Sequence, residues 1–110
     1  MKNPIIEDFK KNVKGYPEKP ALIFDDETLS YKKLDELVSS LSTSLSNLKK
    51  SSIVSTFLEN SVDYVISYLG ILNAGMIAHL IPTNLSDDKI IQQLDNTNPC
   101  LLYTSDAADE

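Results

Sequence analysis

The sequence holds few of the residues from which small catalytic or metal sites are built. Its one cysteine, Cys100, cannot form an internal disulfide or a multi-cysteine metal site. Its one histidine, His79, makes no metal cluster by itself, and no serine lies in a recognisable nucleophile elbow. The three glycines, Gly15, Gly70 and Gly75, lie far apart, so there is no glycine-rich loop to hold a phosphate. Hydrolytic catalysis and nucleotide binding therefore have no support in these residues.

Clustered positive charge and long apolar runs are also missing. The chain has 10 basic and 16 acidic residues and a net charge of -6, and its lysines adjoin only as pairs, so we expect no nucleic-acid binding. The most apolar stretch, residues 62–80, is broken by polar residues and glycines, which makes it a poor candidate for crossing a bilayer. Glu7 and Asp8 stand where a secretory signal would be apolar. We therefore expect a cytoplasmic protein.

The rest of the composition is that of an ordinary globular protein. Hydrophobic residues make up 42% of the chain and charged residues 24%, so neither disorder nor a fibrous repeat is indicated. A chain of 110 residues is one domain or part of one. A unit of this size buries roughly two thirds of its unfolded surface, so a core is feasible.

The first thirty residues predict a helix followed by a β-hairpin. Apolar residues recur at helical spacing before Gly15, a usual place for a helix to stop (Ile5, Ile6, Phe9 and Val13). Two prolines then forbid helix. Residues 21–24 and 28–30 have the composition of strands, and the acidic residues 25–27 between them suit a turn. The two strands should pair antiparallel.

The middle of the chain predicts a strand between two helices. From Tyr31 onward the apolar residues follow the stripe of a helix with one buried face, and Ser30 is placed to cap it. A β-rich run over residues 52–58 comes next. We expect Asn60 to cap a second helix over about residues 61–73. This helix is apolar nearly all round, so it should be covered on two sides.

The last part of the chain continues the same pattern. Gly75 is expected to end the second helix, residues 76–81 form another strand, and together these elements make a βαβ unit. Ser86 is placed to cap a third amphipathic helix, with three apolar residues facing inward (Ile90, Ile91 and Leu94). The predicted fold class is therefore α/β, the start of an open and largely parallel sheet with flanking helices and a hairpin near its beginning.

Several polar residues could contribute to a site, but each has a simpler structural explanation. We favour a structural role for His79, since one histidine makes no metal site. The acids at Asp25, Asp26 and Glu27 are better explained as a hairpin tip than as a cation site. Asp87 and Asp88 suit the positive end of the third helix dipole.

Residues at the expected carboxyl ends of the parallel strands are the other candidates. Asn60, Thr83 and Asn84 follow such strands, where open α/β sheets place ligands, although capping and turn roles explain them too. Tyr64 and Tyr68 lie four residues apart on one helix face, and packing explains them more simply than a role as a platform for substrate. We assign no catalytic, cofactor-binding or metal residue among them.

Residues 100–110 form a segment of unusual origin. When back-translated, these eleven residues resemble a transposon-based sequencing adapter read as coding sequence. We therefore expect residues 1–99 to be native and the protein to continue past Pro99. A natural acidic terminus is the alternative, and reading the genomic locus across this point distinguishes the two. Without the segment the net charge is -3, because it removes Asp106, Asp109 and Glu110 from a total of -6.

Two segments at a fixed separation carry a family resemblance. Thr28-Leu29-Ser30-Tyr31-Lys32-Lys33-Leu34 and the segment from Ile71 to Asn84, with Leu72-Asn73-Ala74-Gly75 leading to Pro82, resemble the first two signatures of the adenylate-forming (AMP-binding) superfamily. This superfamily contains acyl-CoA synthetases, peptide-synthetase adenylation domains and luciferases. The resemblance covers about residues 5–99. Asn73 and His79 depart from the commoner residues, which bears on the subfamily more than on the family.

The resemblance implies a two-step reaction for the whole protein. A carboxylate attacks the α-phosphate of ATP to give an acyl-adenylate and pyrophosphate, and a thiol, usually that of CoA, then takes the acyl group. The family resemblance implies ATP, Mg²⁺ and CoA for the full-length protein, whose phosphate loop and catalytic lysine would lie outside this sequence. We expect this chain alone to be inactive scaffold.

The sequence leaves three functions open. Residues 59–61 look closer to acyl-CoA synthetases, so the favoured function is an acid–thiol ligase that activates a carboxylic acid, expected to be a fatty acid, and transfers it to CoA. The first alternative is an adenylation domain that loads a carrier protein. The second is a non-catalytic α/β binding or scaffold module.

Overall fold

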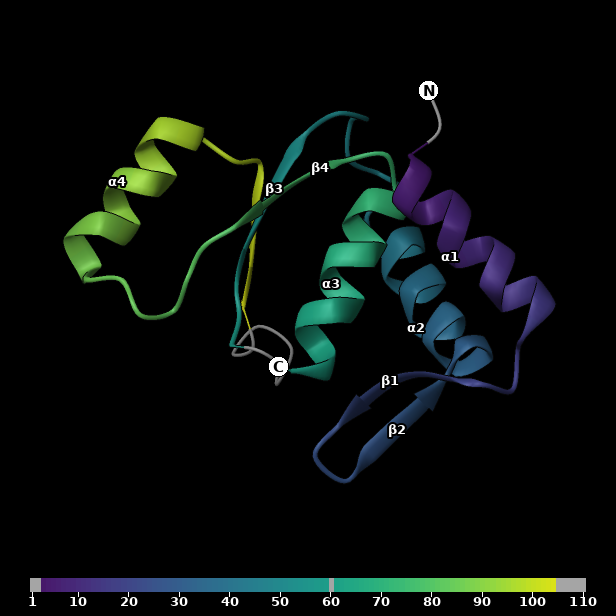
Figure 1. Ribbon diagram of the computed structural model, residues 1–110. Helices are drawn as coiled ribbons and strands as arrows, with labels where there is room; N and C mark the ends of the chain where they lie inside the picture. Colours follow the sequence, from purple (N-terminus) through teal and green to yellow (C-terminus); the bar gives the residue numbers. More distant parts are fainter. Residues whose placement is uncertain (1–2, 60, 105–110) are drawn as a thin grey trace.

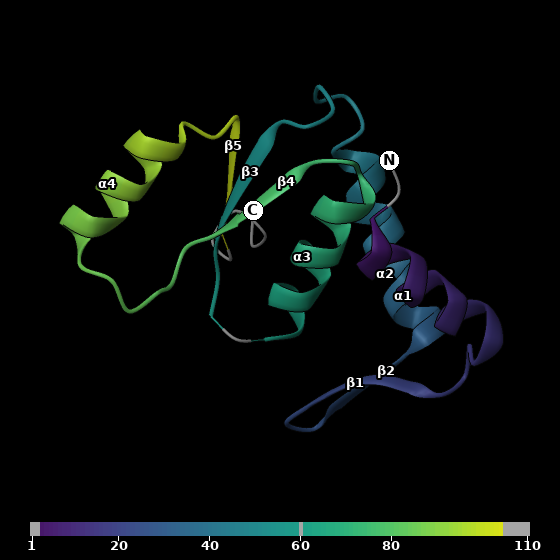
Figure 2. The ribbon, with the colours of Figure 1, turned by 45° about the horizontal axis from the view of Figure 1, so that its top comes forward.

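The computed structural model describes residues 3–59 and 61–104 as an α/β fold (Figure 1). Its elements in chain order are α1 (Pro4–Gly15), β1 (Pro20–Phe24), β2 (Glu27–Ser30), α2 (Tyr31–Ser44), β3 (Ile53–Phe57), α3 (Val62–Asn73), β4 (Ile77–Leu80), α4 (Asp87–Thr97) and β5 (Leu101–Thr104). The first three helices lie together on one side of the parallel strands, and α4 lies on the other side (Figures 1 and 2). The predicted α/β class is confirmed.

The hairpin forms as the sequence predicts. β1 and β2 pair antiparallel, with Phe24 opposite Glu27 across the turn. Asp25 adopts a left-handed backbone conformation with φ of 53°, which aspartate tolerates better than most residues. Leu29 points into the core with 8% exposure, whereas Ile23 on the outer strand is 68% exposed. One face of the hairpin therefore packs on the helices, and the other face is exposed.

Serine hydroxyls cap three of the helices. The Ser30 hydroxyl accepts a hydrogen bond from the Lys33 amide at 3.1 Å, and Ser86 caps α4 in the same way, so both predicted caps are confirmed. The predicted cap of α3 was wrong, because Ser61 caps this helix and accepts from the Tyr64 amide at 3.2 Å. Ser61 is the last residue with extended backbone before the helix, which starts one residue later than expected. Asn60 itself lies outside the described residues.

The three-stranded sheet is wholly parallel and has β3 at its centre. The strand order is β4-β3-β5, with Val54 opposite both Ala78 and Leu101. The central residues Val54, Ser55 and Thr56 are each at most 1% exposed, as expected for a strand covered on both faces. The β3–α3–β4 segment is therefore the predicted βαβ unit, since its two strands run parallel.

The helix α3 joins the two parts of the hydrophobic core. One cluster packs Leu69 of α3 against helices α1 and α2 and the hairpin (Phe9, Leu29, Leu34 and Val38). The other packs Ile71 of α3 against the sheet and the end of α2 (Leu45, Val54 and Met76). This explains why α3 is apolar nearly all round and confirms that it is covered on two sides.

The last helix packs less than the sequence predicts. No residue of α4 is buried, Ile90 and Leu94 are half-buried, and Ile91 is 56% exposed, so the predicted inward position of Ile91 is wrong. The reason is that α4 stands beyond the sheet, away from the other three helices (Figures 1 and 2). The apolar side chains of α4 are therefore only partly covered by the rest of residues 3–59 and 61–104.

Two further features complete the described chain. β5 pairs with β3 and is formed by residues assigned above to the non-native segment 100–110, whose origin stays a prediction. In the part of the chain that the structure describes, every helix is too short or too polar to cross a bilayer.

Candidate functional site

A small hollow lies where β3 and β4 end. Its volume is about 260 Å³. The chain after β3 and the chain after β4 both line it, together with the first turns of α3 (Leu58, Glu59, Tyr64, Leu80, Ile81, Pro82, Thr83 and Asn84). Ligands of open α/β sheets bind at the carboxyl ends of parallel strands, so this is the best candidate for a binding region in the described chain.

Two of the predicted strand-end residues are described by the structure, and the third, Asn60, lies outside the described residues. Thr83 and Asn84 lie in a turn after β4 and line the hollow, as both of their suggested roles require. Tyr64 also lines it. Tyr68 packs against the core cluster that contains Leu69, which confirms its predicted packing role. The two tyrosines therefore do not form one platform.

His79 is held by partners from two elements, β3 and α4. Its Nδ1 atom lies 2.8 Å from the hydroxyl of Ser55 on β3, and its Nε2 atom lies 2.9 Å from the side-chain oxygen of Gln93 on α4. Thr97 lies at the limit of hydrogen-bonding distance, 3.5 Å from Nε2. The neutral ring with its proton on Nε2 satisfies both short contacts, since Nδ1 then accepts from the serine hydroxyl. These contacts give His79 the predicted structural role, and they join α4 to the sheet.

The second signature segment shapes the turn between α3 and β4. Gly75 has a φ of +80°, and the amide of Ser51 donates to its carbonyl at 2.9 Å. The amide of Met76 donates back to Ile71 at 3.1 Å. A left-handed residue is common just after a helix, and glycine adopts it without cost. The segment therefore fixes where β4 begins relative to β3.

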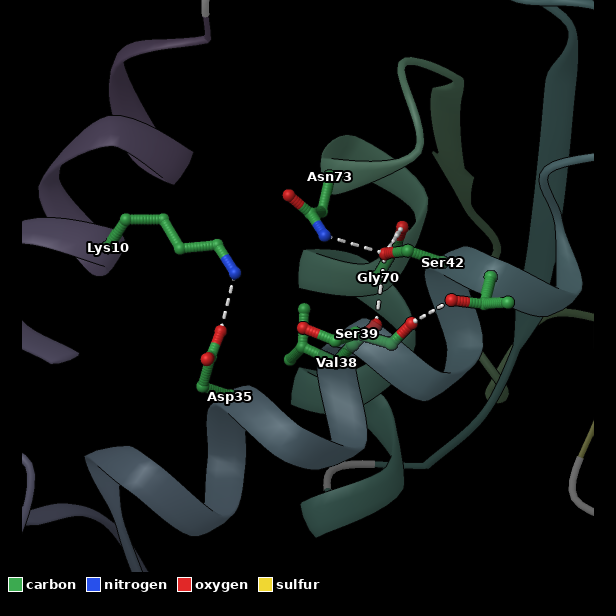
Figure 3. A network of polar contacts seen from close by, with 8 residues as sticks. Lys10, Asp35, Val38, Ser39, Ser42, Gly70 and Asn73 are labelled. Carbon is green, nitrogen blue, oxygen red and sulfur yellow. Dashed lines mark hydrogen bonds and ion pairs between the residues drawn. The ribbon is translucent and has the colours of Figure 1, made fainter.

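Polar contacts tie α3 to α2 beside this turn, as Figure 3 shows. The side-chain amide of Asn73 donates to the Ser42 hydroxyl at 2.9 Å. That hydroxyl lies 3.0 Å from the carbonyl of Gly70 and 2.9 Å from that of Val38. Asn73, which departs from the commoner family residue, therefore has a structural partner of its own. Sequence spacing alone does not indicate this contact, because Ser42 lies 31 residues away.

Four of the five acidic candidates have the structural positions that the sequence predicts, whereas Glu27, predicted in the hairpin turn, is the first residue of β2, where it pairs with Phe24. Asp25 and Asp26 lie in the hairpin turn, and Asp87 and Asp88 lie in the first turn of α4. Within residues 3–59 and 61–104, no three His, Cys, Asp or Glu side chains gather where they could hold a metal ion. The described glycines likewise form no phosphate cradle, since Gly75 ends a helix instead of beginning one. These residues therefore do not fit ATP or Mg²⁺.

One ionisable side chain on β5 is perturbed by its surroundings. Burial raises the pKa of Tyr103, and the negative charge of Asp63 at the start of α3 raises it further. Both effects favour the neutral phenol.

Known proteins resemble this chain in sequence and in structure. Surfactin synthase subunit 3 of Bacillus subtilis is 35% identical over 97 residues, which are 86% of this chain and 8% of that protein. A long-chain-fatty-acid–CoA ligase of Haemophilus influenzae is 34% identical over 77 residues, which are 67% of this chain and 14% of that protein. This chain therefore spans a small part of either relative.

A solved structure shows the same fold. The N-terminal subdomain of Klebsiella oxytoca NpsA superposes with a TM-score of 0.86 at 27% sequence identity, over 93% of this chain and 27% of that chain. The family model described as AMP-binding enzyme matches residues 9–110. The predicted resemblance to the adenylate-forming superfamily is thus confirmed, and this chain belongs to the AMP-binding enzyme family.

Proposed function

We propose that this chain is the amino-terminal part of an adenylation domain that loads a carrier protein. The whole domain would activate a carboxylic acid with ATP and pass the acyl group to a carrier-protein thiol. The observation that carries this proposal is the 35% identity with surfactin synthase subunit 3 over 86% of the chain. The likeness to NpsA supports it, since one NpsA structure is titled an artificially fused adenylation–PCP di-domain NRPS.

The contribution of these residues to that function is structural. The signature segments cap α2 through Ser30 and set the turn at Gly75, and so they hold the helices and parallel strands in register. The strand-end hollow would then form one wall of a larger site completed by later residues. ATP and Mg²⁺ belong to that larger site, because the described residues offer neither a phosphate cradle nor an acidic cluster. The cytoplasm remains the proposed location.

An acyl-CoA synthetase is the second candidate. The sequence of residues 59–61 favours it, and the similarity to the fatty-acid–CoA ligase supports it over 67% of the chain. Synthases such as surfactin synthase subunit 3 match more of the chain, so they favour the carrier-protein alternative. A non-catalytic module remains the third possibility and requires the reading frame to end near residue 110.

The natural locus provides the first test. We expect the reading frame to continue past residue 99 and to encode a Ser/Thr/Gly-rich loop that ends in lysine. A carrier domain downstream of the adenylation domain would support the leading proposal. A stop codon directly after the same eleven residues would contradict both enzyme functions and support the module.

The protein encoded by that locus provides the second test. Substrate-dependent exchange of pyrophosphate into ATP should be screened with amino acids, aryl acids and fatty acids. Mass spectrometry then identifies the acceptor, with a phosphopantetheinylated carrier protein and free CoA offered in parallel. An acyl thioester on the carrier alone is expected, and formation of acyl-CoA alone would favour the second candidate.

A further inference from the structure

The chain carries a lysine-rich groove despite its acidic composition. The groove is open, has a volume of about 970 Å³, and lies between α1 and the turn from α3 into β4. Four of the ten lysines line it: Lys10, Lys11 and Lys14 from α1, and Lys50 from the loop before β3. Lys10 is paired with Asp35 at 2.5 Å (Figure 3). Lys11, Lys14 and Lys50 are exposed, so they can meet an external anion.

Apolar side chains lie between these lysines. Ile6 of α1 and Leu72 of α3 line the groove and are half-buried, and Met76, which also lines it, is buried. One carboxylate, Glu7, also lines the groove, so its surface remains positive overall. An apolar floor with a positive rim favours an acidic segment that also presents an apolar side chain.

The exposed face of α4 has that chemistry. Ile91 is 56% exposed, and helical spacing puts Asp87 and Asp88 one turn before it and Asp95 one turn after it. All three aspartates are exposed, and Lys89 is the one basic residue of the helix. Asp95 lies in the last turn, at the negative end of the helix dipole, so a nearby cation from outside would stabilise it.

The two surfaces lie too far apart to meet within one molecule. Figures 1 and 2 both show α4 and α1 on opposite sides of the fold. The hydrogen bond from His79 to Gln93 also holds α4 against its own sheet. We infer that the exposed face of α4, around Ile91, docks into the lysine-rich groove of a second copy of this chain. The two faces are different, so the contact is heterologous and joins copies head to tail.

Charge reversal in the 110-residue chain tests this inference. Sedimentation velocity measures self-association over a range of protein concentrations. Lys11→Glu with Lys14→Glu reverses the groove, and Asp87→Lys with Asp88→Lys reverses the helix. Each double variant should weaken self-association at least about tenfold, because like charges then face each other. Lys32→Glu with Lys33→Glu is the matched control, since these exposed lysines lie outside the groove, and it should associate like the original chain.

A mixture of the two double variants gives the decisive measurement. The unchanged helix of the groove variant fits the unchanged groove of the helix variant, and the two reversed surfaces also complement each other. Association should therefore return when the variants are mixed in equal amounts, and it should weaken as NaCl rises from about 50 to 500 mM.

Three results would overturn the inference. The first is a chain that stays monomeric at every concentration. The second is association that neither double variant changes, as pairing of sheet edges would give. The third is a mixture that does not recover association. Far-UV circular dichroism of each variant shows that a lost association is not a lost fold, and all four substituted side chains are exposed.

Discussion

At the scale of single residues, the close packing of α2 and α3 depends on a glycine. A Cβ atom at Gly70 would lie 2.7 Å from Cδ2 and 3.1 Å from Cβ of Leu41, so α2 and α3 pack too closely there for any side chain. Gly70 also accepts a hydrogen bond from Ser42 on α2. The sequence showed an isolated glycine in an apolar helix, but the need for it arises only when the two helices meet.

Gly70→Ala should therefore destabilise the fold. We expect a loss of about 1–3 kcal/mol in the free energy of unfolding, because the new methyl group must displace Leu41. Urea unfolding at low protein concentration, followed by circular dichroism, measures it. Gly15→Ala is the matched control, since a Cβ there meets nothing within 4 Å, and we expect no loss from it. Equal midpoints for the two variants would contradict the packing argument.

A buried hydroxyl on β3 gives a prediction of the opposite sign. Thr56 is 1% exposed, and its Oγ1 atom has no hydrogen-bond partner in the described part of the chain. Thr56→Val keeps the shape of the side chain and removes the unpaired oxygen, so it should stabilise the fold by about 1 kcal/mol. Ser55→Ala, one residue earlier, removes the partner of His79 and should destabilise it. The same urea titration compares both, and a loss of stability in the valine variant would refute this prediction.

At the scale of elements, local chemistry predicted most of the fold. The helices, the hairpin and the βαβ unit follow from apolar spacing and from turn residues, which act within a few positions of each other. Asn60 and Ser61 are both good cap residues, so spacing alone could not choose between them. Ile91 was misplaced because burial of α4 depends on packing between distant elements. The partners of His79 could not be predicted either, since they depend on how three elements meet.

The contact made by His79 should control the mobility of α4. His79→Ala removes the hydrogen bonds to Ser55 and Gln93, and α4 has no buried residue to hold it in their place. We expect faster hydrogen exchange at amides of residues 90–97, with little change in α1 and α2. Gln93→Ala should reproduce much of the effect, because it breaks the same link from the helix side. Unchanged exchange in α4 would show that other contacts fix this helix.

Tyr103 makes the attachment of β5 sensitive to alkaline pH. Burial, and then the charge of Asp63, raises its pKa in the folded chain above the ordinary value of 10.0. The fold thus favours the protonated phenol. The resulting stability is fully present below pH 10 and is lost as pH rises through the higher folded pKa. Unfolding free energies above pH 10 should therefore fall more steeply for the original chain than for Tyr103→Phe, and parallel curves would contradict the assignment.

At the scale of the whole molecule, the family could be predicted from sequence, whereas only Tyr64, Thr83 and Asn84 of the residues that line the hollow were among the predicted candidates. The two signature segments identify the family because they set turns and caps that this fold requires, at Ser30 and Gly75. The strand-end hollow is lined by segments that come together only when the chain folds, and we propose that later residues of the whole domain complete it. The subfamily depends on which substrate and acceptor the whole domain binds, and the two signature segments do not indicate these.

The whole chain should therefore lack adenylation activity by itself. Purified residues 1–110, given ATP, Mg²⁺ and a mixture of amino and fatty acids, should exchange no pyrophosphate above a blank without protein. The reason is that the described residues form no phosphate cradle and no metal cluster. A full-length relative from the same family serves as the positive control. Exchange that depends on the added acid would disprove the scaffold role.

The position of β3 has a consequence for biosynthesis. Of the three strands in the described parallel sheet it leaves the ribosome first, and it is also the middle one, with β4 on one side and β5 on the other. The sheet must therefore form outward from its first-synthesised strand. Until β4 and β5 pair with it, both edges of β3 are unpaired. A chaperone that shields unpaired strand edges during translation would bind β3 before β4 and β5 emerge from the ribosome.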